Sequence, residues 1–320
     1  TAMHGVGATM TARVLAEAGF AHVSLVAAQA EPDPDFPTVP FPNPEEAGAL
    51  DMAIEQAQAE DADLIIAVDP DADRCALAVP DPRAETGWAP LSGDQIGCLL
   101  GEFLASRGLE GSLANSIVSS RLLARIAHAH GLEHHTTLTG FKWIARAPQL
   151  AFGYEEAIGF CPNPSVARDK DGIATSVVAA SLFAALKTEG RTAWDELDRL
   201  AHAHGLHVTG PLTFRVEEIE QIATGMARLR AQPPIVLAGS PVVEVSDLAE
   251  GYRGLPPTDG VLVLTEAGDR VIARPSGTEP KLKCYLEVIL PAPEGEPVPW
   301  DAAYERLELI KREFGQIIGL

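Results

Sequence analysis

The sequence predicts an α/β protein: two consecutive α/β domains with mixed, mainly parallel sheets, then a C-terminal α+β domain with an antiparallel sheet. Helical and strand-like patterns alternate over the first two thirds of its 320 residues, as in strand-helix-strand units. Strand patterns dominate after about His207. A hydrophobic content of 46% is enough to fill several cores. We expect domain boundaries at residues 1–90, 91–204 and 205–320.

The first domain is expected to open with a helix from Gly5 to Ala18 and a strand from His22 to Val26. After a Pro-rich loop, an acidic, alanine-rich helix runs from Glu45 to about Ala59. A strand from Asp63 to Val68 completes the unit. Ligands of such sheets gather at the carboxyl ends of the strands.

The second domain repeats the alternation after Ser92, a residue type that caps helix N-termini. The expected elements are a helix at Gly93–Ser106, a strand at Ser116–Ser120, a helix at Leu122–His130, strands at His134–Leu138 and Leu150–Tyr154, and a long helix after Asp171-Gly172.

The third domain is expected to be rich in strands. These are predicted at 208–216, 242–247, 261–265, 270–273 and 281–290, with helices near 216–229 and 300–317. In the last strand, apolar residues from Leu282 to Leu290 alternate with Lys281, Lys283, Tyr285 and Glu287. We therefore expect one buried face and one face exposed to water.

Composition excludes some partners. A net charge of −21, from 24 basic and 45 acidic residues, argues against nucleic acid or an anionic membrane surface. No apolar run is long enough to span a bilayer and no secretory signal is visible, so we expect a cytoplasmic protein. The cysteines are expected to be core residues in a reducing compartment: Cys75, Cys98, Cys161 and Cys284.

Three carboxylates at alternate positions, Asp69, Asp71 and Asp73, directly follow the predicted strand that ends at Val68. Oxygen ligands on a tight loop suit a hard cation such as Mg²⁺, and the adjacent Arg74 could hold a phosphate oxygen beside it. An acidic turn without a metal is the alternative, since Asp and Pro favour turns. A helix-loop-helix calcium loop is excluded because Arg74 stands at the glycine position of that loop.

A second polar run joins two predicted strands of the third domain. Arg274 could bind phosphate bidentately, Gly277 permits a tight turn, and Ser276 and Thr278 offer hydroxyls and amides. With Lys283 these residues predict a phosphate-binding nest. The alternative is a polar hairpin turn with incidental basic residues.

Four further charged residues lie in loops of the second domain. Glu155 and Glu156 stand between two glycines and could accept hydrogen bonds from sugar hydroxyls, or be solvated surface carboxylates. Lys142 could bind phosphate or donate a proton, or be merely solubilising. Lys170 repeats this theme beside Asp171.

Together these loops resemble the α-D-phosphohexomutase family, which includes phosphoglucomutase and phosphomannomutase. The run 69–74 resembles its magnesium loop, with Pro70 where glycine is usual. The run 153–159 resembles its sugar-recognition loop, with Ala157 where many members have serine. The run 274–283 resembles its phosphate-binding loop and is the most specific match. Residues 139–144 are similar to a loop in the branch related to phosphoglucomutase and phosphopentomutase.

The resemblance implies a phosphohexomutase that interconverts hexose 1-phosphate and hexose 6-phosphate through a bound hexose 1,6-bisphosphate. It implies Mg²⁺ on Asp69, Asp71 and Asp73, and catalytic roles for Arg74 and Lys142. The implied substrate-binding residues are Glu155, Glu156, Lys170, Arg274, Ser276, Gly277, Thr278 and Lys283.

One departure from the family concerns its nucleophile. The Ser-His-Asn-Pro segment that carries the phosphoserine does not occur in these residues, and Thr1 to Gly7 resembles the start of the family's second domain. We therefore expect a chain that lacks the family's N-terminal domain, would have that domain as a partner, and is inactive alone. A phosphosugar-binding fragment without catalysis is one alternative. Another alternative is a haloacid-dehalogenase-like phosphatase that uses Asp69 as its nucleophile. That chemistry calls for threonine or valine two places after Asp71, where this sequence has Asp73.

Overall fold

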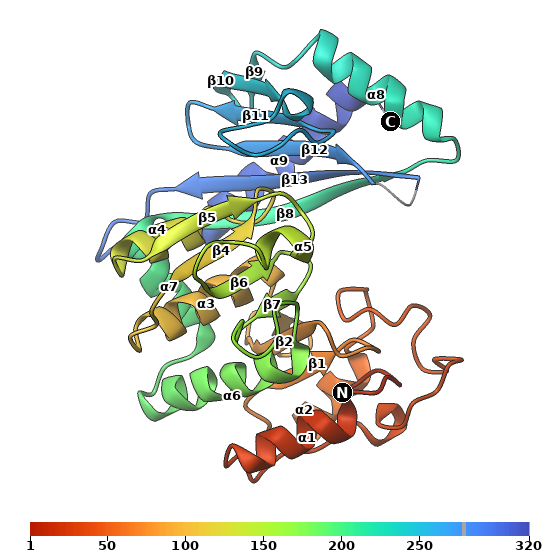
Figure 1. Cartoon of the computed structure of the whole chain (residues 1–320), viewed down its shortest axis with the longest axis vertical. Helices are drawn as coiled ribbons and strands as arrows, with labels where there is room; N and C mark the ends of the chain where they lie inside the picture. The colour runs from red at the N-terminus through yellow and green to blue at the C-terminus, as the bar shows by residue number, and fades with distance from the viewer. Residues whose placement is uncertain (277–279, 320) are drawn as a thin grey trace. The chain divides into compact units, whose positions relative to one another are not determined.

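The computed structural model describes residues 1–276 and 280–319 (Figure 1). They form two compact units. Unit 1 comprises Thr1–Ser116 and Leu123–Leu197, and unit 2 comprises Ile117–Leu122 and Asp198–Leu320. The expected fold class is confirmed, with α/β sheets in unit 1 and an antiparallel sheet in unit 2. The four cysteines are buried and free. Within the described residues, no helix is both long and apolar enough to cross a membrane.

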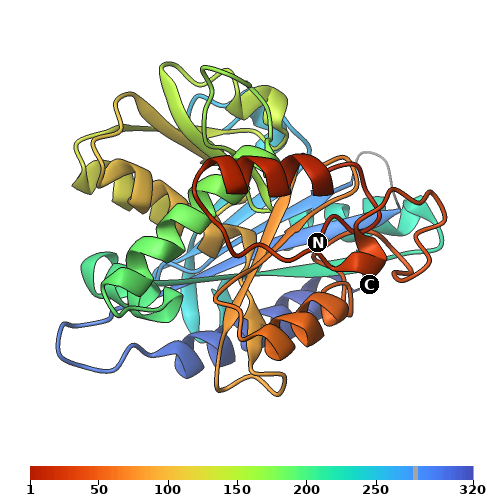
Figure 2. The ribbon, with the colours of Figure 1, turned by 90° about the horizontal axis from the view of Figure 1, so that it is seen from below.

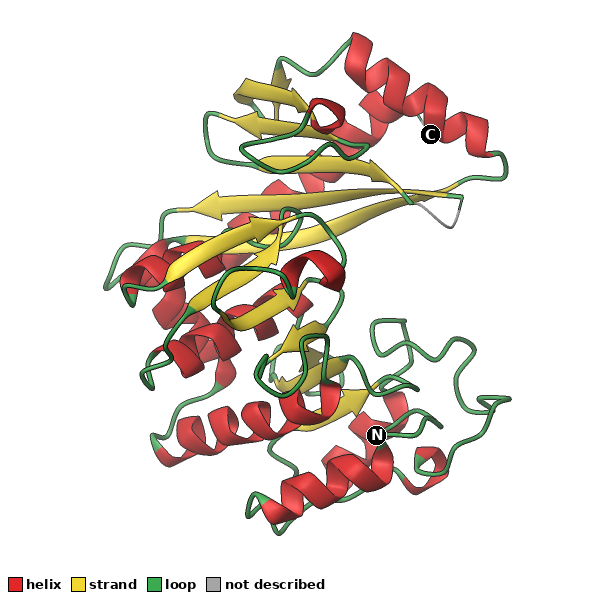
Figure 3. Ribbon diagram, in the orientation of Figure 1, coloured by secondary structure: helices red, strands yellow, loops and turns green. Residues whose placement is uncertain are grey.

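The first sheet of unit 1 has the order β1-β2-β3, with antiparallel pairs. Its elements are α1 (Ala8–Glu17), η1 (Ala27–Gln29), α2 (Asp51–Glu60), β1 (Ile65–Val68), β2 (Cys75–Pro80) and β3 (Trp88–Pro90). Thr1 adds a parallel pairing at the other edge of β1, because its amine donates to the Ile66 carbonyl and its carbonyl accepts from Val68 N–H. The strand expected at His22–Val26 is wrong: no strand lies between α1 and α2 (Figure 3). An extended segment needs a neighbouring strand to take its backbone hydrogen bonds.

The second sheet of unit 1 has the order β5-β4-β6-β7, with two parallel pairs and one antiparallel pair. Its elements are α3 (Gly93–Ala105), β4 (Ser112–Ser116), α4 (Leu122–Ala129), β5 (Glu133–Thr137), α5 (Phe141–Ile144), β6 (Leu150–Glu155), β7 (Gly159–Cys161), α6 (Gly172–Thr188) and α7 (Ala193–His204). Ser92 caps α3 as expected, in a reciprocal capping box with Gln95. The strand expected at Ser116–Ser120 instead ends at Ser116.

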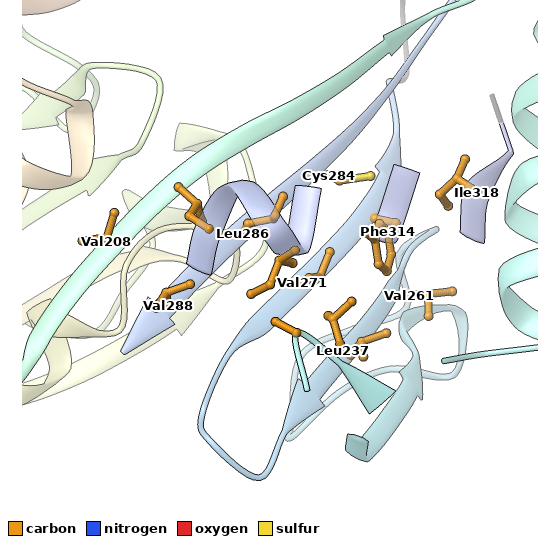
Figure 4. Packing of buried hydrophobic residues seen from close by; sticks show 14 of the residues in the cluster. Val208, Leu237, Val261, Val271, Cys284, Leu286, Val288, Phe314 and Ile318 are labelled. Carbon is orange, nitrogen blue, oxygen red and sulfur yellow. The ribbon is translucent and has the colours of Figure 1, made fainter. Parts of the chain in front are cut away.

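Unit 2 contains an antiparallel sheet of order β8-β13-β12-β11-β10-β9. Its elements are β8 (Leu206–Arg215), α8 (Ile219–Ala231), β9 (Val236–Leu237), β10 (Ser240–Asp247), η2 (Leu248–Glu250), β11 (Val261–Thr265), β12 (Arg270–Pro275), β13 (Lys281–Leu290) and α9 (Trp300–Ile318). Cys284, Leu286 and Val288 of β13 pack with Phe314 of α9 in the core (Figure 4). The observed bounds of β11 and β13 are those that alternation predicts.

The opposite face of β13 is not exposed to water throughout, contrary to expectation, because Glu287 is 0% exposed. The segment Ile117–Leu122, which belongs to unit 2, contacts it there. Ser120 Oγ donates to Glu287 Oε1 at 2.9 Å, and Arg121 Nε donates to Oε2 at 2.6 Å. The alternation of residues in β13 cannot predict that a segment more than 160 residues away in sequence buries Glu287.

Two further residues complete the surroundings of this carboxylate. Arg270, opposite Glu287 in the sheet, pairs with it at 3.1 Å and donates to the carbonyls of Ile117 and Ser119. His207 Nδ1 lies 3.1 Å from Oε1. Burial alone would raise the pKa of Glu287, but Arg270, the His207 hydrogen bond and Arg121 together hold that pKa well below its ordinary value of 4.5.

Glu287→Gln should destabilise unit 2 by about 3–5 kcal/mol, because it leaves the buried Arg270 and the half-buried Arg121 without this counter-charge. Urea unfolding at pH 7 measures this change. Glu294→Gln, which removes the same charge from an exposed position, should change stability by less than ~0.5 kcal/mol.

The stability lost in Glu287→Gln should also depend on pH. Because the folded pKa of Glu287 lies below 4.5, the stability it contributes is fully present above pH 4.5 and disappears as pH falls through the folded pKa. The difference between the native chain and Glu287→Gln should therefore shrink in acid. An equal difference at pH 7 and pH 3.5 would contradict this account.

Candidate functional site

The acidic loop after β1 brings its three carboxylates together. Asp69, Asp71 and Asp73 each offer an oxygen within 4.8 Å of the others. Asp69 organises the turn, because its carbonyl accepts from Ala72 N–H and its Oδ1 accepts from Arg74 N–H, both at 2.9 Å. Ala72 has a φ of +59°, the left-handed conformation that closes the loop. The sequence motif therefore folds into a cluster of hard oxygen donors.

The cluster carries an electrostatic cost that a cation would relieve. Burial raises the pKa of Asp69 to about 6, and the charges of Asp71 and Asp73 add to this, against the hydrogen bond from Arg74 N–H. Carboxylate oxygens on a short loop are the ligands that Mg²⁺ and related divalent cations prefer. The donor set therefore fits a divalent cation.

Two basic side chains border the acidic loop. Lys170 Nζ lies 2.9 Å from Asp73 Oδ2, and Arg74 Nε lies 3.6 Å from Asp69 Oδ2 and 3.8 Å from Asp73 Oδ1. Burial lowers the pKa of Lys170, but the hydrogen bond and charge of Asp73 outweigh it, so that this pKa lies above its ordinary value. The structure thus places Lys170 at the acidic loop, a contact that sequence spacing could not indicate.

The backbone of the glutamate loop (residues 153–159) lies against the acidic loop (residues 69–74). Arg74 forms an antiparallel bridge with Gly159, and Cys75 N–H donates to the Ile158 carbonyl at 3.0 Å. At the start of α6, Gly172 N–H donates to the Ala72 carbonyl at 3.0 Å. A Cβ on Gly172 would lie 2.3 Å from the Arg74 carbonyl oxygen, so only glycine fits there. The acidic loop, the glutamate loop and the segment that leads into α6 therefore meet in unit 1.

The two glutamates hold neighbouring loops. Glu155 Oε1 accepts from Gly140 N–H at 3.0 Å, which ties the glutamate loop to the turn before α5. Glu156 Oε2 accepts from Ser116 Oγ at 3.1 Å. Lys142 is exposed on α5. Glu155 therefore positions the Lys142 loop, a role that the paired-glutamate motif does not reveal.

The predicted phosphate nest lies in unit 2, at the end of the β12–β13 hairpin. Gly277 and Thr278 fall outside the described residues, whereas Ser276 N–H donates to the Lys281 carbonyl at 2.8 Å. Arg274 is directly opposite Lys283, and Lys281 is directly opposite Arg215 of β8. Like charges directly opposite one another destabilise a sheet. Sequence reasoning missed Arg215, because only the strand register brings it here.

An acidic cation loop and a basic hairpin on α/β and α+β units are typical of proteins that handle phosphate esters. Three family models match the chain: phosphoglucomutase/phosphomannomutase alpha/beta/alpha domain II over residues 1–83, domain III over 92–203, and the C-terminal domain over 186–294. The chain belongs to the phosphoglucomutase/phosphomannomutase family.

The curated relatives include mutases with different names. A probable phosphomannomutase of Haemophilus influenzae is 46% identical over 289 residues, which is 90% of this chain and 59% of that protein. A phosphoglucomutase of Staphylococcus haemolyticus is 36% identical, over 90% of this chain and 56% of its own length. A phosphopentomutase of Mus musculus is 31% identical, over 100% of this chain and 55% of its own length. The chain thus spans little more than half the length of these relatives.

A solved structure shares the fold. The putative phosphomannomutase of Thermus thermophilus superposes with a TM-score of 0.69 at 22% identity, over 98% of this chain and 60% of that one. At this identity the likeness concerns the fold alone.

Replacing Asp69 or Asp73 by Asn should weaken Mg²⁺ or Mn²⁺ binding roughly tenfold or more, because each change removes a charged donor from the cluster. Titration calorimetry with each metal measures the affinity. Asp301→Asn, an exposed change of equal charge in α9, is the control and should bind as the native chain does. Unchanged affinity in both cluster variants would contradict a metal site here.

Proposed function

We propose that this chain carries the metal, sugar and phosphate sites of a phosphohexomutase. The reaction interconverts hexose 1-phosphate and hexose 6-phosphate through a bound hexose 1,6-bisphosphate. The observation that carries the proposal is the cluster of Asp69, Asp71 and Asp73, bordered by Arg74 and Lys170 and adjoining the glutamate loop. The names of the relatives, which are mutases of phosphosugars, support the same reaction class.

The residues of unit 1 have distinct proposed roles. Asp69, Asp71 and Asp73 hold Mg²⁺, which supplies charge stabilisation at a transferring phosphoryl group. Arg74 contacts that phosphoryl group, and Lys142 contacts phosphate or transfers a proton. Glu155 and Glu156 accept hydrogen bonds from sugar hydroxyls. Lys170 sets the charge beside Asp73.

In unit 2, the hairpin of β12 and β13 is proposed to bind the phosphate that does not react. Arg274 and Lys283 are adjacent across the two strands, and Ser276 N–H fixes the hairpin end. We include Gly277 and Thr278 in this site by their place in the motif. Residues 1–90, 91–204 and 205–320 would then be a metal domain, a sugar domain and a phosphate domain.

Arg274→Ala should weaken binding of glucose 6-phosphate by roughly tenfold or more, because hydrogen bonds between charged groups contribute about 1.5–3 kcal/mol. Titration calorimetry measures this, with glucose 1-phosphate, mannose 1-phosphate and ribose 5-phosphate in parallel to rank the sugars. The matched control is Arg13→Ala, since Arg13 is an exposed residue of α1 that pairs with Glu17 one turn along the same helix. Equal binding by the native chain and Arg274→Ala would count against the phosphate site.

The 320-residue chain alone should show no mutase turnover, because its sequence contains no Ser-His-Asn-Pro segment to carry the phosphoryl group. A coupled assay with glucose 1-phosphate or mannose 1-phosphate, the matching 1,6-bisphosphate and Mg²⁺ tests this expectation. Robust turnover would overturn it. Phosphate release that needs no sugar bisphosphate and disappears in Asp69→Asn would instead support a phosphatase.

A further inference from the structure

The glutamate loop has a strained backbone at Ile158. This residue has a φ of +54°, in the left-handed region that a β-branched residue rarely adopts, and its side chain is buried. Such a conformation is costly and persists only where surrounding contacts hold it. Cys75 N–H bonds the Ile158 carbonyl, and further contacts come from α3. Glu155 and Glu156 lie just before Ile158, so the contacts that hold this residue also place the two carboxylates.

The first turns of α3 lie directly against the loop and against β6, which leads into it (Figure 2, golden helix). A Cβ on Gly93 would lie 1.9 Å from the Glu156 carbonyl oxygen and 2.9 Å from the Ile158 nitrogen. A Cβ on Gly97, one turn later, would lie 2.5 Å from the Tyr154 ring. Because a real Cβ cannot approach other heavy atoms so closely, only glycine at both positions allows this contact.

Between the two glycines, Asp94 is hydrogen-bonded to the end of β6. Tyr154 Oη donates to Asp94 Oδ1 at 2.8 Å, and both side chains are buried. Burial and the charge of Asp94 hold the pKa of Tyr154 well above its ordinary value of 10, so the phenol keeps the proton that it donates. Glu155 and Glu156 follow Tyr154 directly in sequence. The bond therefore fixes the end of the strand immediately before the two carboxylates.

Two polar side chains behind Tyr154 set the direction of this bond. Asn115 lies directly opposite Tyr154 in the sheet and forms a hydrogen bond with its hydroxyl. His134 Nε2 lies 3.0 Å from Asn115 Oδ1, and it must be the donor because an amide oxygen only accepts. Burial, with a smaller contribution from His135, lowers the pKa of His134 to about 4, so its ring is neutral at pH 7. Each hydrogen bond in this series therefore points toward α3.

We propose that Asp94 and Tyr154 are positioning residues for sugar recognition. Through them, the start of α3 holds the glutamate loop so that Glu155 and Glu156 reach the hydroxyls of a bound sugar phosphate. This positioning role rests on the sugar-binding function proposed above for the loop. Neither side chain would touch the sugar, because Tyr154 has no exposed surface and Asp94 is buried. Phosphate binding by the hairpin of unit 2 should not depend on either of them.

Tyr154→Phe removes the hydroxyl and keeps the ring, so it tests this role directly. The quantity to measure is the ratio of the affinities for glucose 6-phosphate and for ethyl phosphate, an ester without sugar hydroxyls, by titration calorimetry with Mg²⁺ present. Mannose 6-phosphate is titrated in parallel, and the sugar that binds more tightly is used. The ratio should fall about fivefold, because a displaced carboxylate loses hydrogen bonds to sugar hydroxyls. The affinity for ethyl phosphate should not change.

Two variants of Asp94 test the same bond from its other end. Asp94→Asn keeps an oxygen that can accept from the Tyr154 hydroxyl and should keep most of the native ratio. Asp94→Ala removes this acceptor and should lower the ratio as Tyr154→Phe does. Ser112→Ala is the matched control, because Ser112, the first residue of β4, is buried and donates to the Pro148 carbonyl at 2.6 Å. It should lower Tm by a similar amount and leave the ratio unchanged.

A native ratio in both Tyr154→Phe and Asp94→Ala would overturn the proposal, as would an equal fall in Ser112→Ala. Tyr154→Phe should cause no further fall in a chain that already carries Glu155→Gln and Glu156→Gln. A further fall of the same size there would also overturn the proposal, since Tyr154 would not act through these carboxylates. A native chain that binds ethyl phosphate as tightly as the sugar phosphates would contradict the sugar-binding function of the loop itself, and the positioning role would fall with it.

Discussion

The buried carboxylate of Glu287 is the constraint on which the C-terminal unit depends. A charge with no exposed surface is tolerated only if it is paired and hydrogen-bonded, and its partners come from three separate parts of the chain. Arg270 is its neighbour in the sheet, His207 comes from β8, and Arg121 comes from the segment Ile117–Leu122. That segment is therefore held in one place on the sheet, because any other would take Arg121 from Glu287 and two carbonyl acceptors from Arg270.

This constraint also separates two regions on one face of β13. At the Glu287 end, the segment covers the strand, and Ile117 and Val118 pack with Ile272. At the hairpin end, Lys281 and Lys283 keep access to water and stand opposite other basic residues. The same alternation of residues thus produces a buried carboxylate with basic partners at one end and basic residues opposite one another at the other. Only the second is suited to an anion.

Alternation and turn chemistry could predict much of the fold and the order of the functional loops. The bounds of β11 and β13, the Ser92 cap and the carboxylate cluster after β1 all depend on neighbours in sequence. What could not be predicted depends on distant partners. The contact of Lys170 with Asp73, the place of Arg215 opposite Lys281 and the burial of Glu287 follow from strand register and loop docking, which local patterns do not encode.

The charges around the acidic loop imply an order of binding. Three carboxylates face two cationic groups, Arg74 and Lys170, and Lys170 is shared with a fourth carboxylate, Asp169, at 3.8 Å. The loop and its neighbours therefore carry net negative charge when all these groups are ionised. A phosphate dianion is repelled by that charge, and this repulsion is strong where the groups are partly removed from water. A divalent cation on the carboxylates would cancel this net charge and remove the repulsion. For the proposed function, the acidic loop would then receive a phosphorylated ligand only after a divalent cation, whereas the basic hairpin of unit 2 would need none.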